Sequence, residues 1–336
     1  MKLGIIGLPM AGRSTIFETL TRQETDPSLR SEDRIAVVRV PDERVDALSR
    51  MFEPRKTIYA QVEYLLPGTG GSKKDQSPWL AVKECDALIH VVRNHGPERR
   101  PLQDFEALDQ ELILSDLVQV EKRLERIELD QRRGKKTTAE ELHLLTECRR
   151  LMEEGVPLRH RPELVNSKLL RGFTLLSAKP VLVVFNNDEG DPDPPQIGET
   201  AKRERCLVLR GKLEQELARM GPEEVGDYMA EYGIEASALD LMIRLSYEVL
   251  GLASFFTVGS DEVRAWTIRR GTPAVEAAGV IHTDFQKGFI RAEVIAYGDL
   301  MAAGSTAEAR RRGTFRLEGK SYEVKDGDII NFRFNV

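Results

Sequence analysis

The sequence is poor in the residues that build disulfide frameworks and zinc sites. Its 336 residues include only three cysteines, Cys85, Cys148 and Cys206. They lie too far apart for a zinc pair or a C-x-x-C redox motif, and an odd number does not suit a disulfide framework. We therefore expect a protein of a reducing compartment, the cytoplasm.

Long apolar runs are missing as well. No stretch approaches the length of a membrane span. The apolar run at the start, Leu3 to Ile6, is followed by glycine and proline before it reaches the length of a signal-peptide core. We expect a protein that is neither secreted nor inserted in a membrane.

The chain also lacks an excess of positive charge. It has 49 lysines and arginines against 55 aspartates and glutamates, which gives a formal net charge of −6. Such a balance argues against a protein that coats nucleic acid or anionic membrane through bulk charge. Any contact with RNA must be local.

What the chain does have is a glycine-rich loop directly after its first apolar run. Gly7 and Gly12 are spaced as in G-x-x-x-x-G-K-[ST], a pattern whose backbone N–H groups surround a phosphate chain at the start of a helix. Arg13 stands where the lysine belongs. The predicted phosphate-binding residues are Pro9, Met10, Ala11, Gly12, Arg13, Ser14 and Thr15, with Ser14 as the magnesium ligand. A strand-to-helix turn with no ligand is the alternative interpretation.

Further apolar runs predict the strands of an α/β domain. We expect strands over residues 35–40, 58–66, 87–92, 180–185 and 206–209, a helix that starts at Pro41-Asp42, and a closing helix over 239–250. The run at 87–92 is short and bounded by charges, which is typical of a buried parallel strand.

The character of the chain changes to long helices between Asp104 and Met152. Apolar residues recur there at 4-3-4-3 spacing, and a second stripe follows, which together predict an antiparallel hairpin with a coiled-coil seam. Thr138 and Glu141 have the spacing of a capping box for the second helix. The tip between the helices is basic, and its candidate RNA contacts are Arg132, Arg133, Lys135 and Lys136. A solvated charge run is the alternative.

The last part of the chain predicts a small mixed sheet with one helix. We expect strands over 265–268, 289–296 and 329–334, and a helix with Thr272 as its cap and Pro273 at its first position. Asp326-Gly327 indicates a tight turn before the final strand.

Several long strings of this sequence resemble the YchF/Obg-like ATPase family of P-loop proteins. The resemblance covers nearly the whole chain. Gly7 to Thr15 is similar to its phosphate loop, Val40 to Asp46 to its P-D-x-R-L-D segment, and Asp86 to Arg93 to the strand after switch II. The most specific matches are C-terminal: 262–268, 281–292 and 324–332.

The resemblance implies a fold in three pieces. A P-loop G-domain would occupy residues 1–103 and 161–252, a helical coiled-coil insertion 104–160, and a TGS domain of the β-grasp type 253–336. It also implies that Asn186 and Glu189 form the base-recognition motif N-x-x-E, which in this family is associated with adenine. The expected cofactor is therefore ATP, or GTP as the less favoured choice.

The residues that handle phosphate and metal depart from the family pattern. A guanidinium is wider than the lysine ammonium that Arg13 replaces. Switch II should offer D-x-x-G, yet the stretch Tyr64-Leu65-Leu66-Pro67-Gly68-Thr69-Gly70 has leucine where the aspartate should stand. The switch I threonine aligns with Arg30, next to Ser31. We therefore expect Mg²⁺ to be weakly held, by Ser14 alone.

Three functions follow from this pattern. The first is a nucleotide-binding switch or scaffold near the ribosome, with weak or absent hydrolysis. The second is an active, slow ATPase or GTPase, and the third an RNA- or ribosome-binding module whose G-fold is only a support. Asn186 and Glu189 favour the first two, and Arg13 favours the first over the second. The oligomeric state stays open.

Overall fold

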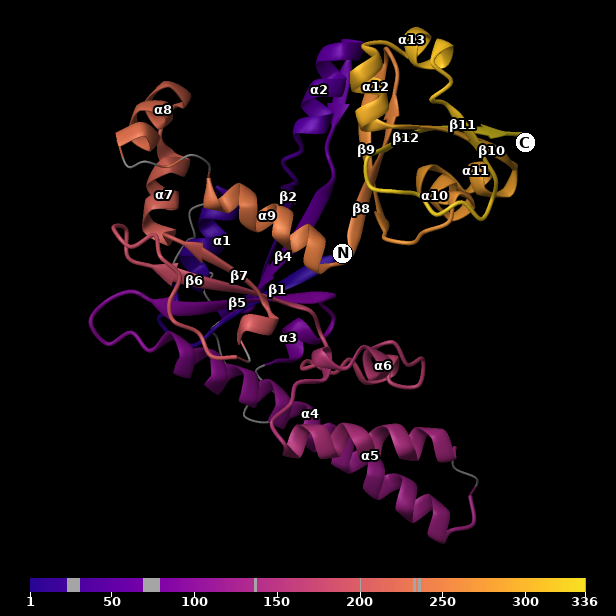
Figure 1. Ribbon diagram of the computed structural model, residues 1–336. Coiled ribbons are helices and arrows are strands. Elements are labelled where there is room, and N and C mark those ends of the chain that lie inside the picture. Colours follow the sequence, from indigo (N-terminus) through magenta and orange to yellow (C-terminus); the bar gives the residue numbers. More distant parts are fainter. Residues whose placement is uncertain are drawn as a thin grey trace. The chain divides into compact units, whose positions relative to one another are not determined.

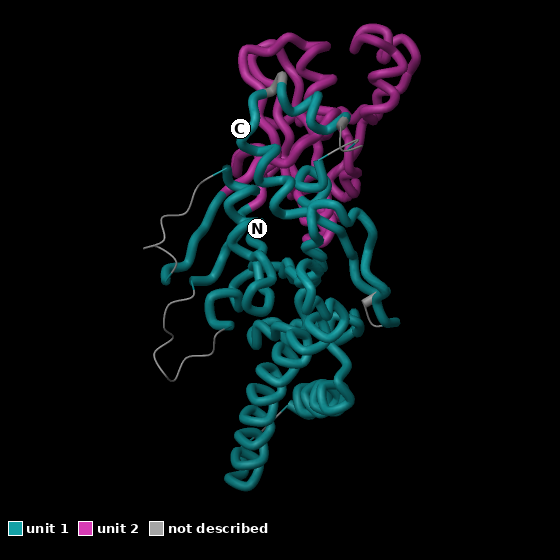
Figure 2. The backbone as a smooth tube through the Cα atoms, turned by 90° about the vertical axis from the view of Figure 1, so that its left-hand side faces the viewer, with its two compact units in different colours: residues 1–36, 63–242 teal, residues 37–62, 243–336 magenta. Residues whose placement is uncertain are grey.

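The fold divides into two compact units. The computed structural model describes residues 1–22, 31–68, 79–135, 138–199, 201–231, 234 and 237–335. Residues 1–36 and 63–242 form unit 1, and residues 37–62 and 243–336 form unit 2 (Figure 2). Residues 37–62 thus group with the C-terminal part of the chain. The division into a G-domain, a helical insertion and a TGS domain, which is expected from the sequence, stays a prediction.

A six-stranded sheet with the order β2-β4-β1-β5-β6-β7 is the frame of unit 1 (Figure 1). Neighbours from β4 to β7 are parallel. The strands are β1 (Lys2–Ile6), β2 (Arg34–Arg39), β4 (Gln61–Leu66), β5 (Ala87–Asn94), β6 (Val181–Asn187) and β7 (Arg205–Leu209), of which β2 and β4 extend into the residues of unit 2.

Helices accompany this sheet and extend from it. They are α1 (Arg13–Thr21), α3 (Leu80–Lys83), α4 (Pro101–Arg132), α5 (Ala139–Glu153), α6 (Pro162–Val165), α7 (Gly211–Arg219) and α8 (Pro222–Glu231). The next helix, α9 (Ala238–Val249), begins in unit 1 and ends among the residues of unit 2. Short 3₁₀ turns lie at Leu158–His160, Arg171–Phe173 and Ala201–Arg203. Within the described ranges, no helix is both long and apolar enough to cross a membrane.

The core of unit 1 explains why its strands are continuous apolar runs. Every residue of β6 is buried, and β5 is buried along nearly its whole length. Because parallel strands are covered on both faces, they carry apolar side chains without alternation. His90 in β5 is buried against Phe105, and burial lowers its pKa to about 3, so it is a neutral core group. The carboxyl ends of the parallel strands are left to carry polar loops.

Helices α4 and α5 lie side by side and form the predicted hairpin (Figure 1). One buried cluster joins the two helices, and it includes Ile113, Val120, Leu124, Ile127, Leu145, Cys148 and Met152. The predicted capping box is wrong, because Thr138 is the N-cap residue but its side chain makes no capping hydrogen bond. Glu141 instead accepts two hydrogen bonds from Arg123 at 2.7 and 3.0 Å, so a full charge attracts it away from the helix end.

Buried polar contacts fix the base of this hairpin. The carboxylate of Asp116 on α4 accepts the backbone N–H groups of Leu176 and Ser177 at 2.9 and 2.7 Å. Arg159 is only 4 % exposed and lies 2.8 Å from Asp109 and 2.5 Å from Glu204. Burial alone would raise the pKa of Glu204, but the hydrogen bond from His160 and the charge of Arg159 hold it below its usual value.

Unit 2 contains a second sheet, with the order β11-β10-β12-β8-β9-β3. It is mixed: β12 is parallel to β8 and β3 to β9, whereas the other pairs are antiparallel. Its strands are β3 (Lys56–Ile58), β8 (Leu252–Val258), β9 (Glu262–Arg269), β10 (Phe289–Ala296), β11 (Arg316–Glu318) and β12 (Asp328–Phe334). Its helices are α2 (Glu43–Phe52), α10 (Ala274–Ile281), α11 (Thr283–Lys287), α12 (Tyr297–Ala303) and α13 (Thr306–Arg311).

The sequence patterns of unit 2 predict some of these elements and miss others. The turn at Asp326-Gly327 precedes β12, and Gly327 has the positive φ of 90° that such a turn requires. Strand β8 is absent from the sequence-based prediction. The cap of α10 is also shifted by one residue, because Pro273 is extended and occupies the N-cap position predicted for Thr272.

We expect Arg159→Ala to destabilise the protein by about 3–5 kcal/mol, because it leaves two buried carboxylates without their cation. Urea unfolding at pH 7 measures this loss. The lowered pKa of Glu204 contributes stability above the unfolded glutamate pKa of about 4.3 and loses it as the pH falls. The difference in free energy of unfolding between the variant and the native protein should therefore become smaller at acidic pH. Arg150→Ala, which removes an exposed partner of Glu147 and Glu154, is the control and should change little.

Candidate functional site

A cavity of about 820 Å³ opens at the carboxyl ends of β1, β5 and β6 within unit 1. All seven residues of the predicted phosphate loop line it, and so do both residues of the predicted base motif, Asn186 and Glu189. The other lining residues are His95, Asn187, Asp188 and Lys212. The fold thus brings together two segments that the sequence places more than half the chain apart.

The loop between β1 and α1 has a tightly constrained backbone. A Cβ added at Gly7 would lie 2.5 Å from the carbonyl oxygen of Val91 in β5, and one at Gly12 would lie 2.2 Å from Nδ2 of Asn186. Gly12 also has a φ of 96°, which L side chains rarely adopt. Met10 has a φ of 67° although it is not glycine, and its side chain is 75 % exposed. Such a conformation costs energy and is held only where the surroundings fix it.

Asn186 is the residue that fixes the loop to its surroundings. Its Nδ2 donates to the carbonyl of Ala11 at 3.0 Å, and its Oδ1 accepts the backbone N–H of Gly211 at 3.0 Å. The side chain therefore joins the phosphate loop to the first turn of α7. The second Nδ2 hydrogen and the second Oδ1 lone pair keep capacity for a ligand.

Glu189 lies on the same side of the cavity with its carboxylate open to solvent. The carboxylate is 3.9 Å from Nζ of Lys212, and the side chain is 48 % exposed. Its backbone carbonyl accepts a hydrogen bond from Arg210 at 3.2 Å. The backbone of Glu189 is therefore fixed, while its carboxylate can still accept a hydrogen bond from an N–H of a ligand.

Arg13 is a half-buried cation in the wall of the cavity. It makes no hydrogen bond or ion pair with any residue that the structure describes, and burial lowers its pKa. It is also the first residue of α1, where the helix dipole favours negative charge. A partly desolvated guanidinium at a helix N-terminus is stabilised when an anion binds beside it.

Ser14 lies beside a second arginine. Nη2 of Arg34, at the start of β2, is 3.5 Å from the Ser14 hydroxyl. In the described ranges, no group of three or more histidine, cysteine, aspartate or glutamate side chains is placed to hold a metal ion. Arg30 lies outside the described residues, so the predicted departure at switch I stays a prediction.

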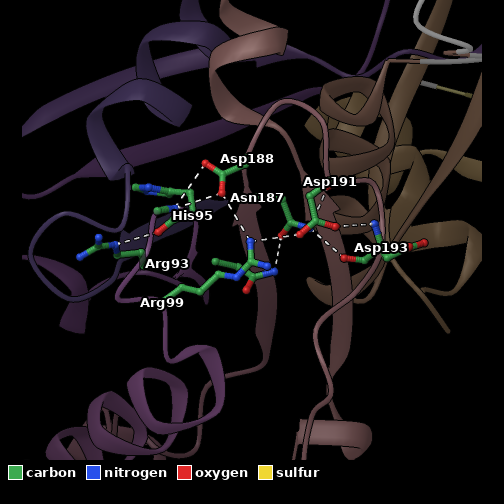
Figure 3. Close-up of polar contacts among 9 residues, drawn as sticks. Arg93, His95, Arg99, Asn187, Asp188, Asp191 and Asp193 are labelled. Carbon is green, nitrogen blue, oxygen red and sulfur yellow. Dashed lines mark hydrogen bonds and ion pairs between the residues drawn. The ribbon is translucent and has the colours of Figure 1, made fainter.

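A polar network that the sequence did not predict joins the loops after β5 and β6 (Figure 3). Asp188 accepts the N–H of Gly96 at 3.1 Å and lies 3.4 Å from Nη1 of Arg99. Arg99 also reaches Asp191 at 3.2 Å. His95 lines the cavity, and burial together with the charge of Arg93 lowers its pKa, so it is neutral near pH 7. The position of His95 directly after a parallel strand is the feature of the sequence that could have identified it as a site residue.

The basic tip of the hairpin is largely solvated. Arg132 is 3.9 Å from Glu128, and Lys135 is 2.7 Å from Asp130. Arg133 is exposed at the C-cap of α4. Lys136 lies outside the described residues. The predicted RNA contacts therefore stay a prediction, and two of them, Arg132 and Lys135, are paired with acidic residues of α4.

Comparison with known proteins identifies the family. Residues 252–335 match the family model YchF-GTPase_C, described as "Protein of unknown function (DUF933)". The chain is 36 % identical to the Ribosome-binding ATPase YchF of Bacillus subtilis, covering 99 % of each chain. It is 35 % identical to that of Escherichia coli O157:H7, covering 100 % of this chain and 99 % of the relative.

A solved structure gives the same relationship in three dimensions. The Schizosaccharomyces pombe YchF GTPase superposes with a TM-score of 0.83 at 28 % identity, over 99 % of this chain and 97 % of the other. The predicted fold class is thereby confirmed. Full-length identity above a third, together with a shared fold, shows that this chain belongs to the YchF family.

Proposed function

We propose that this chain is a nucleotide-binding switch or scaffold that acts at the ribosome, prefers ATP to GTP, and hydrolyses nucleotide weakly or not at all. The observation that carries the proposal is the half-buried guanidinium of Arg13, which lies in a phosphate-loop wall without a protein counter-ion among the described residues. A nucleotide phosphate supplies that missing anion.

The preference for adenine rests on Glu189 and on the named relatives. The Glu189 carboxylate can accept from the exocyclic amine of adenine, while Asn186 holds the loop and keeps one amide hydrogen and one lone pair for the base. The relatives from Bacillus subtilis and Escherichia coli are both named ATPases. These names support ATP as the ligand.

Weak hydrolysis follows from what surrounds the phosphate position. Phosphoryl transfer in P-loop proteins depends on a lysine and on a metal that is held by an acidic residue. Here an arginine replaces the lysine, and the residues at the end of β4 are Leu65 and Leu66, both buried. Neither leucine side chain can accept a hydrogen bond from a metal-bound water.

An active, slow hydrolase is the second candidate, because the similar Schizosaccharomyces pombe protein is named a GTPase. The ribosome is proposed as the partner because the bacterial relatives are named ribosome-binding. The exposed basic tip of the hairpin is the region of the described chain that we propose for this contact. The alternative is a ribosome-binding module in which no nucleotide takes part.

We expect Glu189→Ala to weaken ATP binding by about tenfold, because a hydrogen bond to a charged group is lost. Calorimetric titration with ATP and GTP measures both affinities. The native protein should bind ATP at least as well as GTP, and the variant should lose this preference. Glu163→Ala, a change of an exposed glutamate on α6, is the control. If ATP and GTP bind equally well and Glu189→Ala changes neither affinity, Glu189 does not recognise the base.

We expect Arg13→Lys alone to leave hydrolysis very slow. Groups that act as a unit in phosphoryl transfer are not additive, so restoring the lysine without an acidic residue at the end of β4 recovers little. Single-turnover hydrolysis of ATP and GTP by both proteins measures this, with Ser14→Ala as the control for contaminating activity. Robust turnover by the native chain that disappears in Ser14→Ala would favour the active hydrolase.

We expect glutamine at all four tip positions, Arg132, Arg133, Lys135 and Lys136, to weaken ribosome co-sedimentation and to flatten its salt dependence. Each lysine or arginine that contacts an RNA phosphate releases counter-ions, so its removal lowers the salt slope. The matched control is the double variant Arg149→Gln and Arg150→Gln, which removes charge from the same hairpin away from its tip. If the tip variant sediments like the native protein at every salt concentration, the tip is a solvated turn.

A further inference from the structure

Arg34 lies beside the hydroxyl that contacts the divalent cation in a P-loop protein. The hydroxyl that follows the loop normally contacts Mg²⁺, which bridges oxygens of the β- and γ-phosphates. In this chain Nη2 of Arg34 is 3.5 Å from that hydroxyl, Oγ of Ser14. A permanent positive charge is thus present beside the predicted metal ligand.

The Arg34 guanidinium is held in this position by its surroundings. Nη1 lies 3.7 Å from the carboxylate of Glu18, one turn further along α1. The guanidinium also lies over the ring of Phe17, with its central carbon 5.1 Å from the ring centroid. Its side chain is only 16 % exposed. An arginine packed in this way is already ordered before a ligand arrives.

Among the residues that the structure describes, the oxygen donors near Ser14 do not form a site for Mg²⁺. This ion takes near-octahedral oxygen ligands and is bound through one or two carboxylates. Asp33, next to Arg34, accepts the backbone N–H of Gly68 at 2.9 Å. The Glu18 carboxylate faces Arg34. Leu65 and Leu66 fill the end of β4. A dication would also be repelled by the fixed guanidinium.

We propose that Arg34 replaces the divalent cation, so that the site binds the metal-free nucleotide. Arg34 and Arg13 then both contact the phosphate chain, and the planar guanidinium of Arg34 takes the oxygens that Mg²⁺ would otherwise contact. This inference rests on the proposed nucleotide binding and adds to it the form of the ligand, free ATP in place of its magnesium complex.

Calorimetric titration of the full chain with ATP, in EDTA and in excess MgCl₂, tests the inference. Excess Mg²⁺ converts ATP to its magnesium complex, so the native protein should bind ATP at least about tenfold more weakly in excess MgCl₂ than in EDTA. Arg34→Gln should lose about tenfold or more in EDTA, because a charge-assisted contact to phosphate is removed. Excess MgCl₂ should weaken ATP binding by Arg34→Gln less than it weakens binding by the native protein, since the fixed positive charge no longer repels the ion.

Three further variants separate this role from a general effect on folding or charge. Arg34→Lys keeps the charge without the planar guanidinium and should bind with intermediate affinity in EDTA. Ser14→Ala should have a similar effect with and without Mg²⁺, whereas a metal ligand would matter only with the ion. Arg22→Gln, which removes an exposed charge at the end of α1, is the control and should bind like the native protein. Thermal unfolding identifies any variant that fails to fold.

The inference fails if the native protein binds ATP as tightly in excess MgCl₂ as in EDTA, or more tightly. It also fails if a folded Arg34→Gln binds ATP as well as the native protein in both conditions. A different result would contradict the proposed function itself. If the native protein binds neither ATP nor GTP in EDTA or in excess MgCl₂, both the proposed function and this inference are wrong.

Discussion

The amide of Asn186 is the contact on which the candidate site depends. Its two hydrogen bonds join the carbonyl of Ala11, 175 positions earlier in the chain, to the backbone N–H of Gly211. The glycine at position 12 is required by this contact, because any side chain there would meet Nδ2 of Asn186. The parallel sheet makes the arrangement possible, since it brings the ends of β1, β5 and β6 to one edge. The loop conformation is therefore set by the protein before any ligand binds.

Periodicity and loop chemistry predicted the elements that depend on local sequence. The buried parallel strands, the helical hairpin and the turn at Asp326-Gly327 follow from apolar runs, 4-3-4-3 spacing and glycine chemistry. Most residues of the cavity wall could also be predicted, because the predicted phosphate loop and base motif follow patterns of fixed spacing. The prediction was wrong where a distant charge decided the outcome: Arg123 on α4 attracts Glu141, and Thr138 is left without its capping partner.

The features that sequence reasoning missed depend on contacts between distant segments. Strand β3 pairs with β9, some two hundred residues later, and no local pattern indicates that pairing. The guanidinium of Arg44 is another case, since it binds Asp42 beside it and also Asp326 at 2.7 Å. Two strings that separately resembled the family thus meet in unit 2. Arg34 and His95 carried no motif at all, and only the folded chain shows the first beside Ser14 and the second in the cavity wall.

The charge around the proposed phosphate position connects the proposed nucleotide binding with the proposed weak hydrolysis. A P-loop lysine with Mg²⁺ supplies three positive charges, whereas Arg13 and Arg34 supply two, together with the partial charge of about one half at the start of α1. The phosphate chain of ATP carries more negative charge than this, so part of it would stay open to solvent. Such a balance suits a site that binds and releases nucleotide. Phosphoryl transfer instead needs ordered cations at the oxygens where charge develops, and the two proposed guanidinium contacts would neutralise the phosphates without supplying a metal to hold those oxygens in line.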